Sequence, residues 1–221
     1  MATIYVIAGP PGVGKSTSGR DFIPKELPVL DADLIAHKYK QEGFSDYKDI
    51  GNWRFQDLLR NQLVSGNDFA VELNLGYQNH YDLLKKLKSF NKQNSIEVIL
   101  FHTTDLDLCL ERARVRHENG LHLVEPSIIR EMYSNTIPLL IENIELIAVL
   151  TAIDVRQNDL AIEPFLSWDR VRGDLKILRE PEWLDGKLVE QLKKLTITNA
   201  IKESPKRIDN PKATKRRGRR M

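Results

Sequence analysis

Short apolar runs alternate with longer amphipathic segments along this chain. Clusters of β-branched and other apolar residues predict buried strands at residues 3–8, 29–30, 69–73, 96–102 and 147–153. A helix is predicted to begin near Lys15, and apolar residues at helical spacing predict further helices at residues 33–40, 53–63, 77–90, 106–117 and 126–143. Beyond these, the pattern predicts an edge strand at 175–178 and a last helix at 184–195.

The alternation of strands and helices predicts an α/β fold. Parallel strands joined through helices bury both faces of their sheet, because each crossover helix packs back onto one face. We therefore expect three layers, with a five-stranded, mostly parallel sheet and helices on both faces. A chain of 221 residues is long enough for one such domain with its own core.

Composition narrows the class of protein. The chain is 41% hydrophobic and 29% charged, which is typical of a soluble globular protein. Its longest apolar runs are about five residues, far below the ~20 that a membrane-spanning helix needs, so no membrane partner is expected. The first residues lack the pattern of a secretory leader, which predicts a cytoplasmic location. The lone cysteine, Cys109, lies in an apolar helical pattern and is predicted to be a core residue rather than a reactive thiol.

Positive charge is concentrated at the end of the chain. Residues 202–221 contain nine Lys and Arg but only two acidic residues, a net charge of +7 in a chain whose total is +2. Because this stretch also has almost no apolar residues, it is predicted to be a disordered basic tail that follows a domain at 1–201. Such a tail either keeps the protein soluble or attaches it to a nucleic acid or an acidic partner.

The strongest chemical signal is a glycine-rich loop between the first strand and the first helix. It comprises Gly9, Pro10, Pro11, Gly12, Val13, Gly14, Lys15, Ser16 and Thr17 and contains the phosphate-binding pattern G-x-x-x-x-G-K-[ST]. The prolines have no N–H, so the backbone donors to phosphate are expected from Val13 to Thr17. Lys15 is expected to contact the β- and γ-phosphates, and the Ser16 hydroxyl to coordinate Mg²⁺. These residues predict a P-loop NTPase or kinase fold that binds ATP.

Other sequence features distinguish among the P-loop classes. The stretch closest to the guanine-specific N-K-x-D motif, residues 91–94, lacks the aspartate and follows a helix. The predicted strands at 96–102 and 147–153 do not lead into the Asp-Asp or Asp-Glu pair of motor ATPases. Small kinases place a substrate carboxylate after the second strand and arginines in a later lid, and this chain has both. The sequence therefore favours a kinase.

Several short motifs occur in the order and spacing of a known family. They are YVIAGPPGVGKST at 5–17, DADLIA at 31–36, FAVE at 69–72, LER at 110–112, GLHLV at 120–124 and IREMY at 129–133. With these motifs the chain resembles the zeta toxin family of P-loop kinases over about residues 3–155. The resemblance implies transfer of the γ-phosphoryl group of ATP to a hydroxyl of a nucleotide sugar such as UDP-N-acetylglucosamine. It also implies an antitoxin or inhibitor protein as a partner.

Three carboxylates are candidates for the acceptor side. Asp33 matches the family's aspartate and is the candidate general base, although it could also cap the helix that follows. Asp31 could orient the acceptor or a Mg²⁺-bound water, or simply be solvated at the end of its strand. Glu72 lies near the end of the third strand, where open α/β sheets bind ligands, and is either a substrate ligand or an outward-facing residue.

Arginines on two later helices are candidates for a lid. Arg112 and Arg116 are four residues apart on one helical face, and Arg130 lies on the next helix. They are expected to bring guanidinium groups onto the transferring phosphate, unless they are ordinary surface charges. Arg114 points elsewhere on the same helix. His122 is expected to shape the lid or the sugar pocket, with a core or solvent position as the alternative, and no structural metal site is predicted.

Three functional hypotheses follow from these residues. The first is an ATP-dependent small-molecule kinase of the zeta toxin type. The second is a related P-loop kinase acting on a nucleoside, an antibiotic or an RNA end, for which the basic tail would suit RNA. The third is an NTP-binding regulatory protein or toxin–antitoxin assembly protein without turnover.

Overall fold

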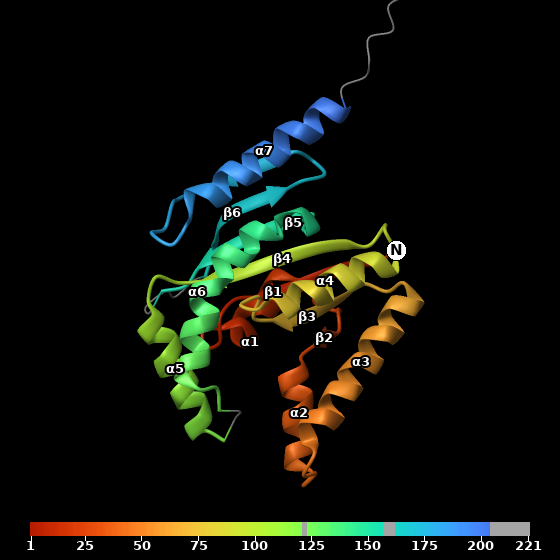
Figure 1. Ribbon diagram of the computed structural model, residues 1–221, viewed down its shortest axis with the longest axis vertical. Coiled ribbons are helices and arrows are strands. Elements are labelled where there is room, and N and C mark those ends of the chain that lie inside the picture. The colour runs from red at the N-terminus through yellow and green to blue at the C-terminus, as the bar shows by residue number, and fades with distance from the viewer. Residues whose placement is uncertain (121–122, 157–161, 204–221) are drawn as a thin grey trace, which may run out of the picture.

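One seven-stranded sheet with helices on both faces forms the protein (Figure 1). The computed structural model describes residues 1–120, 123–156 and 162–203. The strands, in spatial order, are β2 (Val29–Leu30), β3 (Phe69–Leu73), β1 (Thr3–Ala8), β4 (Ser95–His102), β5 (Val149–Asp154), β6 (Pro164–Asp169) and β7 (Asp174–Ile177). The first five are parallel, and β6 and β7 continue the sheet in antiparallel orientation.

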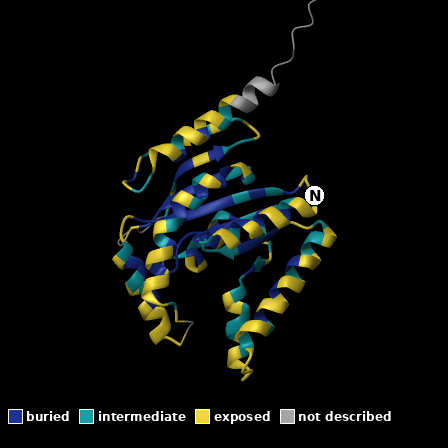
Figure 2. Cartoon of the chain, in the orientation of Figure 1, coloured by how far each residue is buried: buried dark blue, intermediate teal, exposed yellow. Residues whose placement is uncertain are grey.

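The helices follow the predicted alternation. They are α1 (Lys15–Ser18), α2 (Ala32–Gln41), α3 (Tyr47–Ser65), α4 (Gln78–Phe90), α5 (Leu106–Glu118), α6 (Pro126–Glu142) and α7 (Gly186–Glu203), with 3₁₀ turns at Gly19–Phe22 and Ile144–Leu146. Side chains alternate between the two faces of each strand. Ile4 and Val6 thus belong to a core with residues of α3, α4, α6 and α7, whereas Ile7 belongs to a second core with residues of α5. The sheet thus separates two apolar cores. Its central strands are largely buried and appear dark blue in Figure 2.

Two sequence predictions about the elements were wrong. The sheet has seven strands rather than five, because β6 was not predicted and the edge strand expected at 175–178 joins the same sheet as β7. The stretch Pro164–Asp169 escaped prediction because it begins with proline and has no clean alternation, yet Phe165, Leu166 and Trp168 are fully buried. The helix predicted at 53–63 begins earlier, at Tyr47.

The order of the strands determines where a ligand site can form. β1 lies between β3 and β4, so the chain leaves β1 at the point where the connections turn to opposite sides of the sheet. Open α/β sheets bind ligands at this switch point, beyond the carboxyl ends of the strands. The glycine-rich loop follows β1 directly. Two helical hairpins, α2–α3 and α5–α6, project from this edge on either side of α1 (Figure 1).

The α2–α3 hairpin stands away from the main cores. α2 has no fully buried residue (Figure 2). Its main neighbour is α3, and the two helices meet closely where Gly51 faces Ala36. A Cβ on Gly51 would lie 2.6 Å from the Ala36 Cα, so only glycine allows the helices to approach this far.

The predicted basic tail at 202–221 falls almost entirely outside the described residues. α7 continues to Glu203, so the expected boundary after residue 201 falls within a helix, and the tail from 204 to 221 is outside the described part. No helix within the described ranges combines the length and apolar character needed to cross a membrane.

A buried histidine links the end of β4 to the last part of the fold. The His102 ring lies between Tyr133 and Trp183, with centroid distances of 4.9 and 4.8 Å. Its Nδ1 accepts a hydrogen bond from the Thr103 N–H, whereas Nε2 has no partner among the described residues. The Trp183 indole in turn donates to Asp154 at 2.8 Å. Burial lowers the pKa of His102 to about 4 from its ordinary 6.5.

We expect this histidine to make the fold sensitive to acid. The folded state keeps His102 neutral down to about pH 4, whereas the unfolded chain takes up a proton near pH 6.5, so stability falls as the pH drops through this window. Its share of the loss is about 2 kcal/mol between pH 7 and pH 5. His102→Asn keeps an acceptor for the Thr103 N–H but does not titrate. Urea unfolding across this range should therefore show a shallower loss of stability in the variant, and an unchanged slope would contradict the assignment.

Candidate active site

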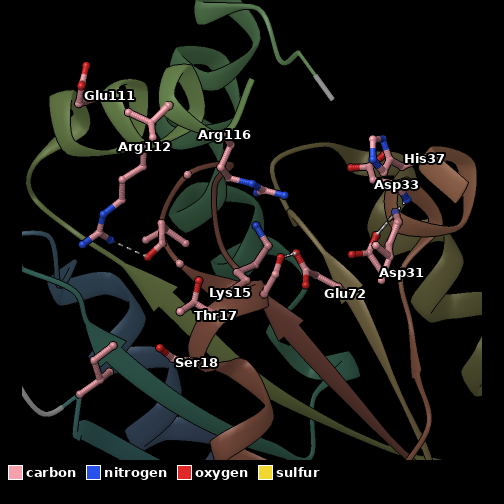
Figure 3. A pocket seen from close by; sticks show the side chains of 17 residues that line it. Lys15, Thr17, Ser18, Asp31, Asp33, His37, Glu72, Glu111, Arg112 and Arg116 are labelled. Carbon is pink, nitrogen blue, oxygen red and sulfur yellow. Dashed lines mark hydrogen bonds between the residues drawn. The ribbon is translucent and has the colours of Figure 1, made fainter. Parts of the chain in front are cut away.

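A cavity of about 840 Å³ opens at the carboxyl ends of β1, β2 and β3. It is lined by the glycine-rich loop and α1 on one side, by the start of α2 on another, and by α5 above (Figure 3). The lining residues are Gly12, Val13, Gly14, Lys15, Ser16, Thr17, Ser18, Asp31, Asp33, Leu34, His37, Glu72, Glu111, Arg112, Val115, Arg116 and Ile162. Most of the predicted site residues thus come together in one space.

Glycines shape the loop because no other residue fits. Gly9, Gly12 and Gly14 have φ values of 137°, 82° and 106°. A Cβ on Gly9 would lie 2.1 Å from the Phe101 carbonyl oxygen on β4, and one on Gly12 would lie 2.1 Å from the Cys109 carbonyl oxygen on α5. The loop is therefore packed backbone to backbone against both neighbours. Gly9, Pro10 and Pro11 do not line the cavity themselves but form the base of the loop.

The backbone of the loop leaves a short row of donors. The N–H groups of Thr17 and Ser18 both donate to the Gly14 carbonyl at 3.1 Å, and that of Val13 donates to the Pro10 carbonyl at 3.4 Å. The N–H groups of Lys15 and Ser16 open α1 and have no preceding turn to bond to. The N–H groups available to a phosphate are thus those of Gly14, Lys15 and Ser16. The N–H groups of Val13 and Thr17, at the two ends of the range predicted from the sequence, donate to carbonyls of the loop instead.

Lys15 is a buried cation with three acceptors. Only 6% of the residue is exposed, and its Nζ donates to the carbonyls of Gly9 at 2.8 Å and Pro10 at 3.1 Å and to Asn74 Oδ1 at 2.8 Å. Burial lowers the pKa of Lys15 below its ordinary value, and the nearby Glu72 carboxylate opposes this shift. Asn74 was not predicted, although its place two residues beyond Glu72 at the end of β3 could have indicated it.

The turn that presents Asn74 is conformationally unusual. The next residue, Leu75, is fully buried with a φ of 52°, a left-handed conformation that is costly for a branched side chain. Beyond it, a Cβ on Gly76 would lie 2.6 Å from Met132 on α6. Packing against α6 thus holds the turn in place, and with it the amide that faces Lys15.

Ser16 and Glu72 both line the cavity and contact each other. The Ser16 hydroxyl donates to Glu72 Oε1 at 3.0 Å. Burial raises the pKa of Glu72, and Lys15 and this hydrogen bond oppose the shift. Glu72 therefore faces inward, as the ligand interpretation expected, and lies next to the residue predicted to bind Mg²⁺.

The structure distinguishes Asp31, which caps α2, from Asp33, which does not. Asp31 is the N-cap of α2, because its carboxylate accepts from the N–H groups of Asp33 at 2.9 Å and Leu34 at 3.1 Å. Burial raises the pKa of Asp31. The cap is thus Asp31 and not Asp33, whose exposed carboxylate borders the cavity opposite Lys15 and Glu72 (Figure 3).

Two of the predicted arginines reach the cavity from α5. Cys109, Arg112 and Arg116 share one face of this helix, and the contact of Cys109 with the loop brings the two arginines over the P-loop. An Arg112 guanidinium nitrogen donates to the Val13 carbonyl at 3.4 Å. Arg114 points away and pairs with Glu111 and Glu118 on the surface. Cys109 itself is buried, as predicted, and burial raises its thiol pKa to about 11.

Of the other two predicted lid residues, only Arg130 falls within the described part of the chain. Arg130 is exposed on α6 and does not line the cavity. His122 lies outside the described residues. His37, by contrast, lines the cavity without having been predicted. Its position four residues after Asp33 on the same helix was the signal that could have identified it.

Comparisons with known proteins support the fold. No protein-family model matches the sequence, and no curated protein matches it. Two structures of the AvrRxo1-ORF1:AvrRxo1-ORF2 complex, one with sulphate ions and one with ATP, each have a TM-score of 0.60 and 12% identity and cover 90% of this chain and 76% of the other. The PezAT chromosomal toxin–antitoxin system of Streptococcus pneumoniae has a TM-score of 0.54 and 15% identity, covering 90% of this chain and 88% of that chain. The chain thus shares its overall fold with proteins of these two complexes.

Proposed function

We propose that this protein is an ATP-dependent kinase that transfers the γ-phosphoryl group to a hydroxyl of a small molecule. One observation carries the proposal: a single cavity holds the P-loop residues Lys15 and Ser16, the carboxylate of Asp33 opposite them, and arginines from α5 above. Phosphoryl transfer needs this combination of phosphate-binding donors, a carboxylate at the nucleophile and cations on the transferring oxygens. The fold supports it, because similar structures include one solved with ATP.

The residues present fit ATP and Mg²⁺. The amide row from Gly14 to Ser16 suits phosphate oxygens, and the Lys15 ammonium can exchange its amide and carbonyl acceptors for them. The Ser16 hydroxyl and the Glu72 carboxylate are hard oxygen ligands of the kind that Mg²⁺ prefers, directly or through water. When bound, Mg²⁺ would neutralise charge on the phosphates.

Asp33 is the proposed general base. Asp31 already caps α2, so the Asp33 carboxylate is not needed for the helix and can accept the proton of the attacking hydroxyl. Arg112 and Arg116 are proposed to stabilise the charge that spreads over the transferring oxygens. Arg130 and His122 stay predictions.

We also propose an acceptor and a protein partner. The family resemblance suggests a nucleotide sugar such as UDP-N-acetylglucosamine as acceptor. Two similar structures come from systems with a second protein, AvrRxo1-ORF2 and the antitoxin part of PezAT, so we propose an antitoxin or inhibitor protein here too. The division into a kinase domain at 1–201 and a basic tail at 202–221, which could contact nucleic acid, stays a prediction, as does a cytoplasmic location.

The direct test is a phosphate-transfer assay. Purified protein with ATP and Mg²⁺ is offered nucleotide sugars, nucleosides, antibiotics and RNA 5′-ends, and labelled products are sought. Lys15→Ala serves as the inactive control, with its folding checked by circular dichroism. Labelling of a small molecule by the wild type alone supports the proposal. Nucleotide binding without transfer to any acceptor would favour a regulatory protein.

Asp33→Asn should separate catalysis from nucleotide binding. The variant loses the base but keeps the cap supplied by Asp31, so kcat should fall by ~10²-fold or more while ATP affinity stays nearly unchanged. Steady-state kinetics and binding of a fluorescent ATP analogue measure the two effects. A kcat within threefold of wild type would show that Asp33 is not the base.

The arginines of α5 offer a matched comparison. Arg112→Ala or Arg116→Ala should lower kcat by ~10²-fold with a smaller change in KM for ATP, since each removes a donor to the transition-state charge. Arg114→Ala removes only surface ion pairs, which are worth little, and should change the kinetics by less than about twofold. Similar effects at Arg114 and Arg116 would mean that the phosphate clamp comes from elsewhere.

A further inference from the structure

A second cavity, of about 280 Å³, lies between α2 and α3. Its lining residues are Ala32, Asp33, Ala36, His37 and Lys40 from α2 and Tyr47, Lys48 and Asn52 from α3. Neither Lys40 nor Lys48 belongs to the motifs that carry the family resemblance. The two lysines are therefore a feature of this cavity that the motifs do not explain.

The second cavity continues from the first along one face of α2. Asp33, His37 and Lys40 are spaced by four and three residues, which places them in a row on this face. Asp33 and His37 line both cavities, whereas Lys40 lines only the second. At a rise of 1.5 Å per residue, the row from Asp33 to Lys40 spans about 10 Å. A small molecule with its reacting hydroxyl at Asp33 could therefore extend to Lys40.

Small residues keep this space open. The α2 side of the cavity is formed in part by Ala32 and Ala36, whose side chains are single methyl groups. Close contact between Ala36 and Gly51 fixes the spacing of the two helices. The space is thus built into the hairpin by its sequence.

Two ammonium groups dominate the charge of the second cavity. Lys40 Nζ lies 5.8 Å from the centre of the Tyr47 ring, which holds it against the wall of the cavity. Lys48 comes from the facing helix, and Asn52 adds an amide one turn further along α3. Within the described parts of the chain, no ion pair joins either lysine to a carboxylate. Asp33, at the inner end, is the one carboxylate that lines this cavity.

We propose that the second cavity binds a phosphate group of the acceptor. Two lysines and an amide supply charge-assisted and neutral donors from opposite helices, which suits a dianionic phosphate better than a neutral group. Bound there, the phosphate would hold the acceptor along α2 so that a hydroxyl lies at Asp33. The proposal rests on the proposed kinase function and narrows its substrates to phosphate-bearing molecules.

The test uses a simple anion in place of the unknown acceptor. Full-length protein is first saturated with Mg²⁺ and a non-hydrolysable ATP analogue, so that the P-loop is filled, and is then titrated with pyrophosphate or methyl phosphate by calorimetry. We expect the wild type to bind one further equivalent. Lys40→Ala and Lys48→Ala should each weaken this binding by about tenfold, the loss of one charge-assisted contact.

Lys38→Ala is the matched control. Lys38 has the same charge, is exposed on the same helix and does not line the cavity, so its removal should leave anion affinity within about twofold of wild type. No binding of the anion, or equal weakening by all three variants, would overturn the proposal. Acetate should bind more weakly than methyl phosphate, and equal binding would overturn the assignment to phosphate.

Failure of this proposal differs from failure of the kinase function. Anion binding that depends on Lys40 and Lys48 supports the site even if no acceptor is phosphorylated, in which case only the kinase function fails. Conversely, efficient phosphorylation of an acceptor without a phosphate group, with KM unchanged in Lys40→Ala and Lys48→Ala, would overturn the site and leave the kinase function intact.

Discussion

The burial of one ammonium group organises the site. Lys15 lies at the start of α1 with carbonyls of its own loop and the Asn74 amide around it, and a buried charge needs such partners to be tolerated. The loop can supply its carbonyls only because the glycines let it pack directly against β4 and α5. This close packing also brings the arginines of α5 over the loop, next to Lys15.

Local pattern was sufficient to predict the parallel part of the fold. The predicted strand at 3–8 matches β1, and those at 29–30 and 69–73 match β2 and β3, because continuous apolar runs ended by turn residues mark buried strands well. β6 was missed because its apolar residues are interrupted by Ser167 and preceded by Pro164, so its burial depends on pairing with β5 and β7 rather than on its own pattern.

The site was predictable where a motif fixed the chemistry and less so where packing decided it. Lys15, Asp33 and Glu72 were predicted from motifs, from their places after strands and from the family resemblance, and all three line one cavity. Capping was the alternative role considered for Asp33, but Asp31 and Asp33 are both suitable caps, and the start of α2 places the cap at Asp31. Asn74 and His37 belong to none of the motifs, and the fold brings Asn74 to the Lys15 ammonium and His37 to the cavity.

The strained turn at Leu75 lies between α6 and Lys15 and contacts both. Its far side, Gly76, fits against Met132 with no room for a side chain, while its near side carries the amide that binds Lys15. α6 follows α5, the helix that carries Arg112 and Arg116. A displacement of α5 and α6 would therefore act on Gly76, which is only two residues from the Asn74 amide at Lys15. The α5–α6 hairpin and the Lys15 ammonium are therefore joined by a continuous set of contacts, from Met132 to Gly76 and from Asn74 to Lys15.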